Sequence, residues 1–362
     1  MGQFDKDRFQ KELAIRYCLA RGMVPFPEVL VPSAADLTDS AEVLTDIDVL
    51  GLEAVSDGAL HRTMFDCKTA SRLSAVNRAF WAAGVAGYTK CNHAFVILKN
   101  RAVHNHRMSA LAMGVDLHTE QSFSDLGASV STDYPAETAY QSSIGRWQQL
   151  QGAYDANPWA RELHHLNRNV VPLSTAAPAV FRRYLAELRA LRGRFDPAKP
   201  QHVAIYLEAI SAILVLWVSM SRDARRFYEP TISMGEFERT LRYYLWGGRE
   251  SYEIRQQLRD RSIPDGGQAS AVELPAWGRL VSFVGIVIAA PQGIFDCILY
   301  CRELAIRQVS QREARFDERL VALCQSNSRV KQFSVALSDY LVAACGVPKD
   351  LGRRAAAELL GE

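Results

Sequence analysis

Residues 43–69, VLTDIDVLGLEAVSDGALHRTMFDCKT, decide the fold expected for this chain. Over 43–55 apolar residues alternate with other residues, a pattern typical of a β-strand. A Ser-Asp-Gly turn signal follows at 56–58, and 62–69 then predicts a second strand. We therefore expect two neighbouring strands joined by a tight turn.

Acidic residues are concentrated on these two strands. Side chains alternate along a strand, so Asp46 and Asp48 share one face of the first, and Asp66 and Lys68 share one face of the second. Three carboxylates would then meet a single ammonium inside an apolar sheet, where unbalanced charge is unfavourable. A divalent cation is the natural partner, and oxygen ligands favour Mg²⁺ or Mn²⁺. The expected metal ligands are Asp46, Asp48, Asp66 and the backbone carbonyl of Cys67.

This set of groups predicts phosphodiester hydrolysis more readily than acyl or hydride transfer. A bound metal can lower the pKa of a water molecule and shield the charge that develops on phosphorus. Lys68 would orient or deprotonate the attacking water. The catalytic residues expected from the strands are Asp48, Asp66 and Lys68.

The flanking sequence predicts a small mixed α/β sheet covered by helices. The expected order is helix, strand, strand, strand, helix, strand, helix, strand. The two acidic strands are the second and third of these strands. The other segments are a helix over 7–21, an apolar run at 29–31, a helix over 70–86, a buried strand at 94–98, a helix-like stretch ending at Gly114 and a short strand at 115–117.

At the acidic strands the sequence resembles the PD-(D/E)xK nuclease superfamily, which has the restriction-endonuclease-like fold. Asp48 matches the first acid of the signature, and Asp66-Cys67-Lys68 matches the (D/E)-x-K part. The segment AFVILKN at 94–100, a helix, and then GVDL look similar to the strand–helix–strand that closes the core in Mrr-like members. Glu12 stands where many members carry an acid on the first helix. No proline precedes Asp48, a departure that the family tolerates.

The resemblance covers roughly residues 7–125 and implies a Mg²⁺-dependent endonuclease acting on double-stranded DNA. By analogy with the family, such an enzyme serves in prokaryotic defence against foreign DNA. Glu12 would be an accessory catalytic residue. Basic residues near the two strands are candidates for phosphate contacts, although each could equally be a solvated surface charge. They are Arg72, Arg78, Lys99, Arg101, His104 and Arg107.

A boundary is expected within 121–145, which is rich in Ser, Thr, Gly and Ala. It separates a nuclease-like domain, 1–130, from an α-helical domain, 131–362. The helical domain would serve recognition, regulation, or contacts with a second copy or a partner subunit. Basic residues at 222–226 could contact nucleic acid or cover the core. Helices are expected at 176–193, 201–222, 234–260, 276–290, 294–326 and 328–345.

Composition narrows the classes of function. The 362 residues include 42 basic and 40 acidic side chains, which excludes a highly basic nucleic-acid coat protein but allows an enzyme with a local positive groove. Seven scattered cysteines and the absence of an apolar leader indicate a reducing cytoplasm. The apolar stretches 209–220 and 280–290 are shorter than the roughly 20 residues that span a bilayer. An RNA or structured-DNA nuclease, and a non-catalytic nuclease-like subunit, remain alternatives.

Overall fold

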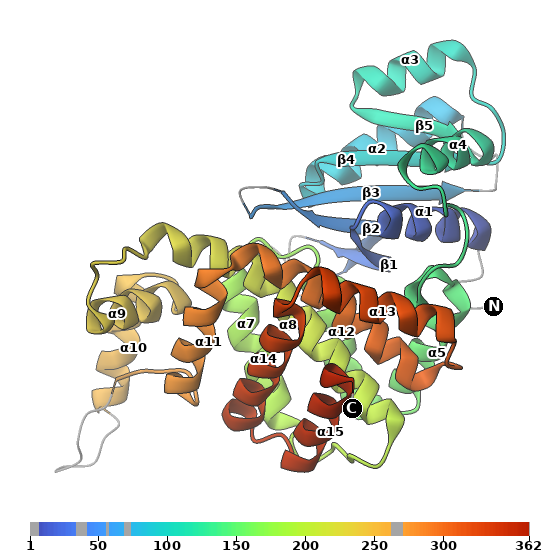
Figure 1. The fold of residues 1–362 in the computed structure, drawn as a ribbon. Coiled ribbons are helices and arrows are strands. Elements are labelled where there is room, and N and C mark those ends of the chain that lie inside the picture. The colour runs from blue at the N-terminus through green and yellow to red at the C-terminus, as the bar shows by residue number, and fades with distance from the viewer. Residues whose placement is uncertain (1–6, 34–41, 56–57, 69–73, 262–270, 362) are drawn as a thin grey trace.

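The computed structural model describes residues 7–33, 42–55, 58–68, 74–261 and 271–361. Its N-terminal part has the expected order of helices and strands (Figure 1). The elements are α1 (Arg8–Ala20), β1 (Val24–Pro32), β2 (Val43–Ala54), β3 (Leu60–Lys68), α2 (Ala75–Thr89), β4 (His93–Leu98), α3 (His104–Ala112), β5 (Val115–Thr119) and α4 (Glu120–Val130).

The five strands form one mixed sheet in the order β1-β2-β3-β4-β5. Strands β1, β2 and β3 pair antiparallel, whereas β3, β4 and β5 pair parallel. Helices α1 and α4 lie in front of the sheet in Figure 1, and α2 lies behind it. The expectation of a mixed sheet flanked by helices is therefore confirmed.

Aromatic side chains fill the space between the sheet and its front helices. Phe65 of β3 stacks on Phe95 of β4 with ring centroids 5.3 Å apart. Tyr17 of α1 and Phe123 of α4 approach each other with centroids 5.2 Å apart and also contact Phe65. Because side chains alternate along β3, placing Phe65 in this core turns Asp66 and Lys68 toward the other face.

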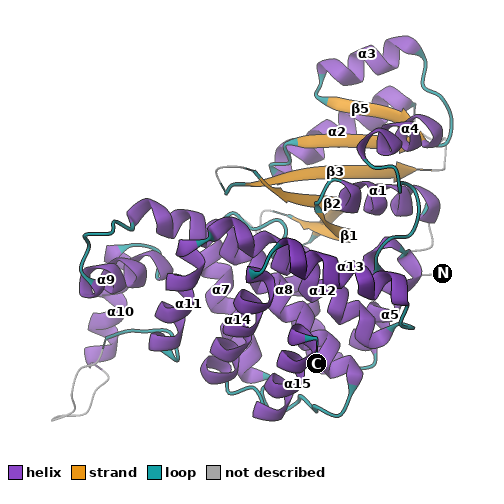
Figure 2. Cartoon of the chain, in the orientation of Figure 1, coloured by secondary structure: helices purple, strands orange, loops and turns teal. Residues whose placement is uncertain are grey.

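Helices form the remainder of the described chain (Figure 2). The long helix α8 is buried along nearly its whole length and contacts α5, α7, α11, α12, α14 and α15. The larger elements of this part are α5 (Ile144–Asp155), α6 (Arg161–His165), η5 (Leu166–Val170), α7 (Ala177–Ala190), α8 (Pro200–Phe227), α9 (Met234–Leu245), α10 (Arg249–Arg261), α11 (Trp277–Ala289), α12 (Ile294–Val309), α13 (Ala314–Ser326), α14 (Arg329–Cys345) and α15 (Lys349–Leu360).

Several expected boundaries were wrong for identifiable reasons. The expected helix over 234–260 is broken at Gly247 and Gly248, whose φ angles of 84° and 109° are incompatible with a right-handed helix. The segment 121–145 was expected to be a connection, but it contains α4. Its start is fixed by Thr119, whose hydroxyl accepts a hydrogen bond from the Ser122 N–H.

Helix α8 (Pro200–Phe227) extends beyond the predicted helix over 201–222 and well beyond its apolar stretch at 209–220. Its 28 residues are long and apolar enough to cross a membrane. However, 94% of its most apolar 18-residue window is buried inside the protein, as in the core helix of a helical bundle.

The helical part covers the outer edge of β1. The Arg302 guanidinium of α12 donates to the Pro25 carbonyl at 2.9 Å, and Arg168 of η5 donates to the Glu28 carbonyl at 2.7 Å. The Leu30 N–H donates to the Asn169 side chain at 2.8 Å. These bonds satisfy backbone groups that a free edge strand would expose.

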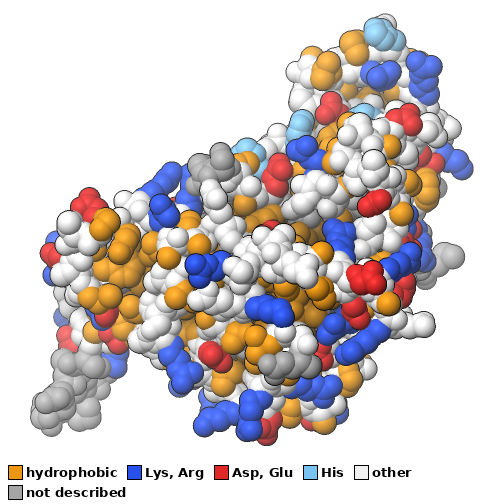
Figure 3. Space-filling view, in the orientation of Figure 1, with side chains coloured by type: hydrophobic (Ala, Val, Ile, Leu, Met, Phe, Trp, Pro, Cys, Tyr) orange, Lys and Arg blue, Asp and Glu red, His pale blue; other side chains and the backbone are white. Residues whose placement is uncertain are grey.

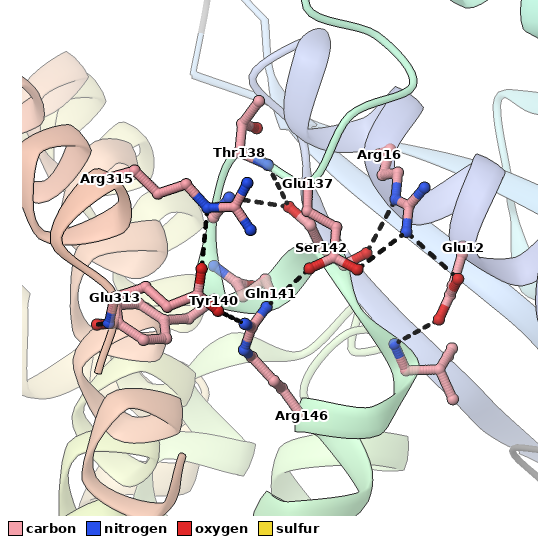
Figure 4. A network of polar contacts seen from close by, with 12 residues as sticks. Glu12, Arg16, Glu137, Thr138, Tyr140, Gln141, Ser142, Arg146, Glu313 and Arg315 are labelled. Carbon is pink, nitrogen blue, oxygen red and sulfur yellow. Dashed lines mark hydrogen bonds and ion pairs between the residues drawn. The ribbon is translucent and has the colours of Figure 1, made fainter. Parts of the chain in front are cut away.

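A second polar network joins α1, the segment that follows α4, and α13 (Figure 4). Arg16 donates to the backbone carbonyls of Pro135 and Ser142. Arg146 of α5 bridges Glu137 and Glu313. The sheet-bearing and helical parts are thus held together by polar contacts as well as by a shared hydrophobic core.

Candidate catalytic cluster on strands β2 and β3

The register of β2 and β3 brings their acidic residues together. The last paired residues of this ladder are Val49 and Phe65, so Asp48 and Asp66 are the next residues on each strand. The Lys68 ammonium lies 2.9 Å from Asp48 Oδ2 and 3.7 Å from Asp66 Oδ1. Both carboxylates therefore lie within reach of one cation, at the point where the two strands stop pairing.

Asp48 is also bound by the backbone. The Cys67 N–H donates to Asp48 Oδ2 at 2.8 Å. Cys67 is a residue of β3, and it also pairs with Ile97 of the neighbouring parallel strand β4. Asp48 is only 4% exposed, so this carboxylate depends on the protein rather than on water for its hydrogen bonds.

Asp66 is held by a guanidinium from the following helix. Arg78 of α2 donates from Nε to Asp66 Oδ2 at 2.8 Å and from Nη2 to Oδ1 at 2.5 Å, a bidentate arrangement. Its guanidinium also lies 4.6 Å from the centre of the Trp81 ring. Because Nε and Nη2 of Arg78 are bonded to Asp66, a phosphate contact through these two donors would have to replace this pair, and the predicted contact with nucleic acid stays a prediction.

Burial raises the pKa of Asp66 to about 6. The charges of Arg78 and Lys68 lower this pKa, and the neighbouring charge of Asp48 raises it. The two nearby cations therefore do not fully compensate for removing this carboxylate from water beside a second one.

Two members of the cluster, Lys11 and Glu28, were not predicted from the sequence. The Lys11 ammonium of α1 bonds Glu28 and lies 3.6 Å from Asp48 Oδ1. Glu28 is fully buried, and its Oε2 has no hydrogen-bond partner among the described residues. Its backbone adopts a left-handed conformation, φ 58°, which is unusual for glutamate and typical of functional sites. Burial raises the pKa of Glu28 to about 7, although Lys11 opposes the shift.

Sequence signals for this pair existed but were weak. Glu28 interrupts a run of apolar residues and prolines from Val24 to Pro32, and Lys11 lies on the side of α1 that also carries the buried residues Ala14 and Ile15. A charged residue in such surroundings indicates a partner. Nothing in the sequence shows that the two residues are partners of each other.

The cluster carries more acid than base. Its acids are Glu28, Asp48, Asp66 and Asp7, whose Oδ2 lies 4.0 Å from the Lys68 ammonium, and its bases are Lys11, Lys68 and Arg78. If all are ionised, four negative charges face three positive ones. This excess, and the hard oxygen donors of Asp48, Asp66 and the Cys67 carbonyl, fit a divalent cation in charge and in donor type.

The positions of these oxygen donors are less favourable for a metal site than their charge and type. Within the described ranges no three His, Cys, Asp or Glu side chains are grouped as a metal site would require. Both oxygens of Asp66 are engaged by Arg78. A cation and Arg78 would therefore compete for Asp66.

Glu12 does not join the cluster, contrary to prediction. It is the neighbour of Lys11, and successive helical residues point about 100° apart. Its carboxylate accepts hydrogen bonds from Arg8, from Arg16 and from the Ile144 N–H, within the network of Figure 4. Glu12 thus connects α1 to α5 at the junction between the two parts of the chain.

Asp46 lies at the margin of the cluster. It is half-buried and pairs with Leu30 of β1. Burial lowers the pKa of Arg168, and the negative charge of Asp46 opposes this shift. The ion pairs around Lys68 instead include Asp7 as the third carboxylate.

The remaining candidates for phosphate contacts follow β4. Lys99 and Arg101 are exposed just after Leu98, which pairs with Lys68, and they therefore lie at the same end of the sheet as the cluster. His104 and Arg107 are exposed on the first turn of α3. Arg72 lies outside the described residues.

Comparisons of the chain with protein-family models, with curated proteins and with solved structures found no match. The function is therefore inferred from the geometry and charge of this cluster.

Proposed function

We propose that this chain is a metal-dependent endonuclease that hydrolyses phosphodiester bonds of DNA, and that its sheet is a restriction-endonuclease-like core. One observation carries the proposal: the Lys68 ammonium lies between the carboxylates of Asp48 and Asp66, where β2 and β3 separate. These are the three residues that match the PD-(D/E)xK signature. The order of helices and strands from α1 to β5 agrees with the same resemblance.

Asp48, Asp66 and the Cys67 carbonyl would hold Mg²⁺ or Mn²⁺. The bound cation would supply a water of lowered pKa and neutralise charge on the scissile phosphate. Binding requires Arg78 to give up at least one oxygen of Asp66, since both are engaged. Arg78 thus opposes cation binding in this arrangement.

Lys68 is suited to donate hydrogen bonds to a phosphate oxygen or to the attacking water. Burial alone would lower its pKa, but the charges of Asp48 and Asp66 outweigh burial and hold the pKa above its ordinary value. Lys68 therefore keeps its proton at neutral pH and acts as a donor, not as a base, while both carboxylates are charged. Its side chain is 20% exposed, so a substrate can approach it.

The test is a cleavage assay with plasmid DNA in Mg²⁺, in Mn²⁺ and in EDTA. The variants are Asp66→Ala and Lys68→Ala, with the exposed pair Asp350→Ala and Lys349→Ala as matched controls. We expect cleavage by the wild type and both controls only with metal, and a loss of at least about 100-fold in both site variants. Equal cleavage by the site variants would refute the assignment.

A second candidate is a nuclease-like fold that binds nucleic acid without cutting it. The bidentate Arg78–Asp66 pair favours it, because this pair leaves the cluster internally bonded without a metal. This candidate predicts DNA binding in a gel-shift assay that survives Asp66→Ala and Lys68→Ala, with no cleavage of DNA or RNA. Cleavage of RNA alone would keep the catalytic assignment and change the substrate.

A further inference from the structure

A large cavity lies away from the catalytic cluster, between the end of the β2–β3 hairpin and the helical part. Its volume is about 1210 Å³, above the range of roughly 300–1,000 Å³ that is usual for small-molecule sites. Ala54 and Gly58 line it from the hairpin, and the end of α8 and the starts of α12 and α14 line it from the helical part. Basic side chains are visible near this junction in Figure 3.

The charges that line the cavity are strongly unbalanced. Among the described lining residues four are arginines, Arg222, Arg225, Arg226 and Arg329, and one is a carboxylate, Asp296. Asp296 accepts a hydrogen bond from the Asn327 amide at 2.8 Å. The described part of the wall therefore carries more basic than acidic side chains, which favours an anion.

Three of these arginines have no carboxylate partner in the part of the chain that the structure describes. Arg225 donates to the Ile288 carbonyl and Arg329 to the Gln332 side chain. Among the described residues, Arg225, Arg226 and Arg329 form no ion pair. By contrast, Arg242 and Arg307 of the same helical part each pair with a carboxylate at 2.6 Å or less.

The chemistry of the wall matches a phosphate ester better than a simple inorganic anion. Arginine forks pair with phosphate oxygens through two parallel hydrogen bonds. Half-buried Phe295 offers an aromatic surface on which a base can stack, and the amide of Gln292 can donate to and accept from a base edge. Arg329 also begins α14, where the helix dipole favours negative charge.

We infer that this cavity binds the phosphates of a nucleotide, either a free nucleotide or a segment of the nucleic-acid strand. Ala54 lies six residues after Asp48 on β2, so the hairpin side of the cavity is about 20 Å from the catalytic cluster at the usual rise per residue. The cavity is thus separate from the cluster but is built partly on the same two strands. Of the two sources, only the nucleic-acid strand rests on the proposed nuclease function, and the free nucleotide does not.

The test measures binding in EDTA, where cleavage is not expected. The probes are ATP, followed by calorimetry, and a fluorescein-labelled 20-nucleotide DNA strand, followed by anisotropy. The site variant is Arg225→Ala/Arg329→Ala. The control is Arg189→Ala/Arg194→Ala, which removes two exposed arginines outside the cavity. Thermal unfolding of each variant checks that it folds.

We expect the site variant to bind at least about tenfold more weakly, since each lost charge-assisted hydrogen bond contributes about that factor. The control should stay within about twofold. Loss of ATP affinity identifies the free nucleotide as the source, and loss of affinity for the DNA strand alone identifies the strand.

The inference is overturned if the wild type binds neither probe, or if the site variant binds both as well as the wild type does. Asp66→Ala is expected to leave ATP affinity unchanged. A failure of the nuclease proposal would therefore not be confused with a failure at the cavity.

Discussion

Replacing Lys11 by methionine removes the ammonium that bonds Glu28 and lies 3.6 Å from Asp48. Methionine has a similar length, so the change removes charge and leaves little empty space. Lys11 is 1% exposed and Glu28 is fully buried, so the variant leaves a buried carboxylate without its partner. Breaking a buried ion pair in this way costs about 3–5 kcal/mol of unfolding free energy.

The loss should depend on pH, because Glu28 can take up a proton. Burial already raises its pKa to about 7 with Lys11 present, and removing Lys11 raises it further. At pH 5.5 Glu28 is neutral in the variant, and we expect a loss of only about 1–2 kcal/mol. At pH 8, about one unit above the wild-type pKa, keeping Glu28 protonated costs the variant about 1.4 kcal/mol more, and we expect a loss of about 2.5–3.5 kcal/mol.

Urea unfolding at both pH values, followed by circular dichroism, measures these losses. Lys349→Met, which removes an exposed lysine, should change stability by less than about 0.5 kcal/mol. The double variant Lys11→Met/Glu28→Gln should recover part of the loss at pH 8, because it removes both charges. An equal loss at the two pH values, or no recovery in the double variant, would refute the reasoning.

Three further predictions concern stability. The folded-state pKa values of Glu28 and Asp66, about 7 and about 6, lie above their ordinary values of 4.5 and 3.8. The folded state then holds more protons than the unfolded state, and we expect these groups to make the wild type less stable in urea as pH rises from about 4 to 7. Arg302→Met removes a buried guanidinium that donates to the Pro25 carbonyl and interacts with the negative charge of Glu208, and should lower the free energy of unfolding by about 3 kcal/mol. The control Arg353→Met at the surface should change it by almost nothing. Glu303→Ala leaves the N–H groups of Tyr140 and Gln141 without their acceptor. Thermal or urea unfolding should show a loss of about 2–4 kcal/mol in the free energy of unfolding. A loss below about 1 kcal/mol would mean that water replaces the carboxylate.

The order of elements in the sheet could be predicted because local patterns determine it. Alternation along β2 and β3 and the apolar run of β4 are properties of short segments. The convergence of Asp48, Asp66 and Lys68 also follows from alternation and one tight turn. These predictions needed no knowledge of distant contacts.

The rest of the cluster depends on tertiary structure. Lys11 and Glu28 meet only because α1 packs on the sheet and Glu28 adopts a left-handed backbone, neither of which a single segment reveals. The error at Glu12 was one residue along a helix, enough to turn its side chain toward α5. Arg78 was recognised as basic, but its orientation toward Asp66 depends on where α2 begins.

The bonding along β1 bears on how this protein can be studied in pieces. Pro25 and Pro27 cannot donate backbone hydrogen bonds, and the outward carbonyls of Pro25 and Glu28 are covered by arginines from beyond residue 160. A fragment ending near residue 130 would lose this cover and expose an apolar strand able to recruit the same strand of another copy. Such a fragment should form insoluble aggregates, so we do not expect truncation at that boundary to yield the sheet-bearing part as a soluble protein.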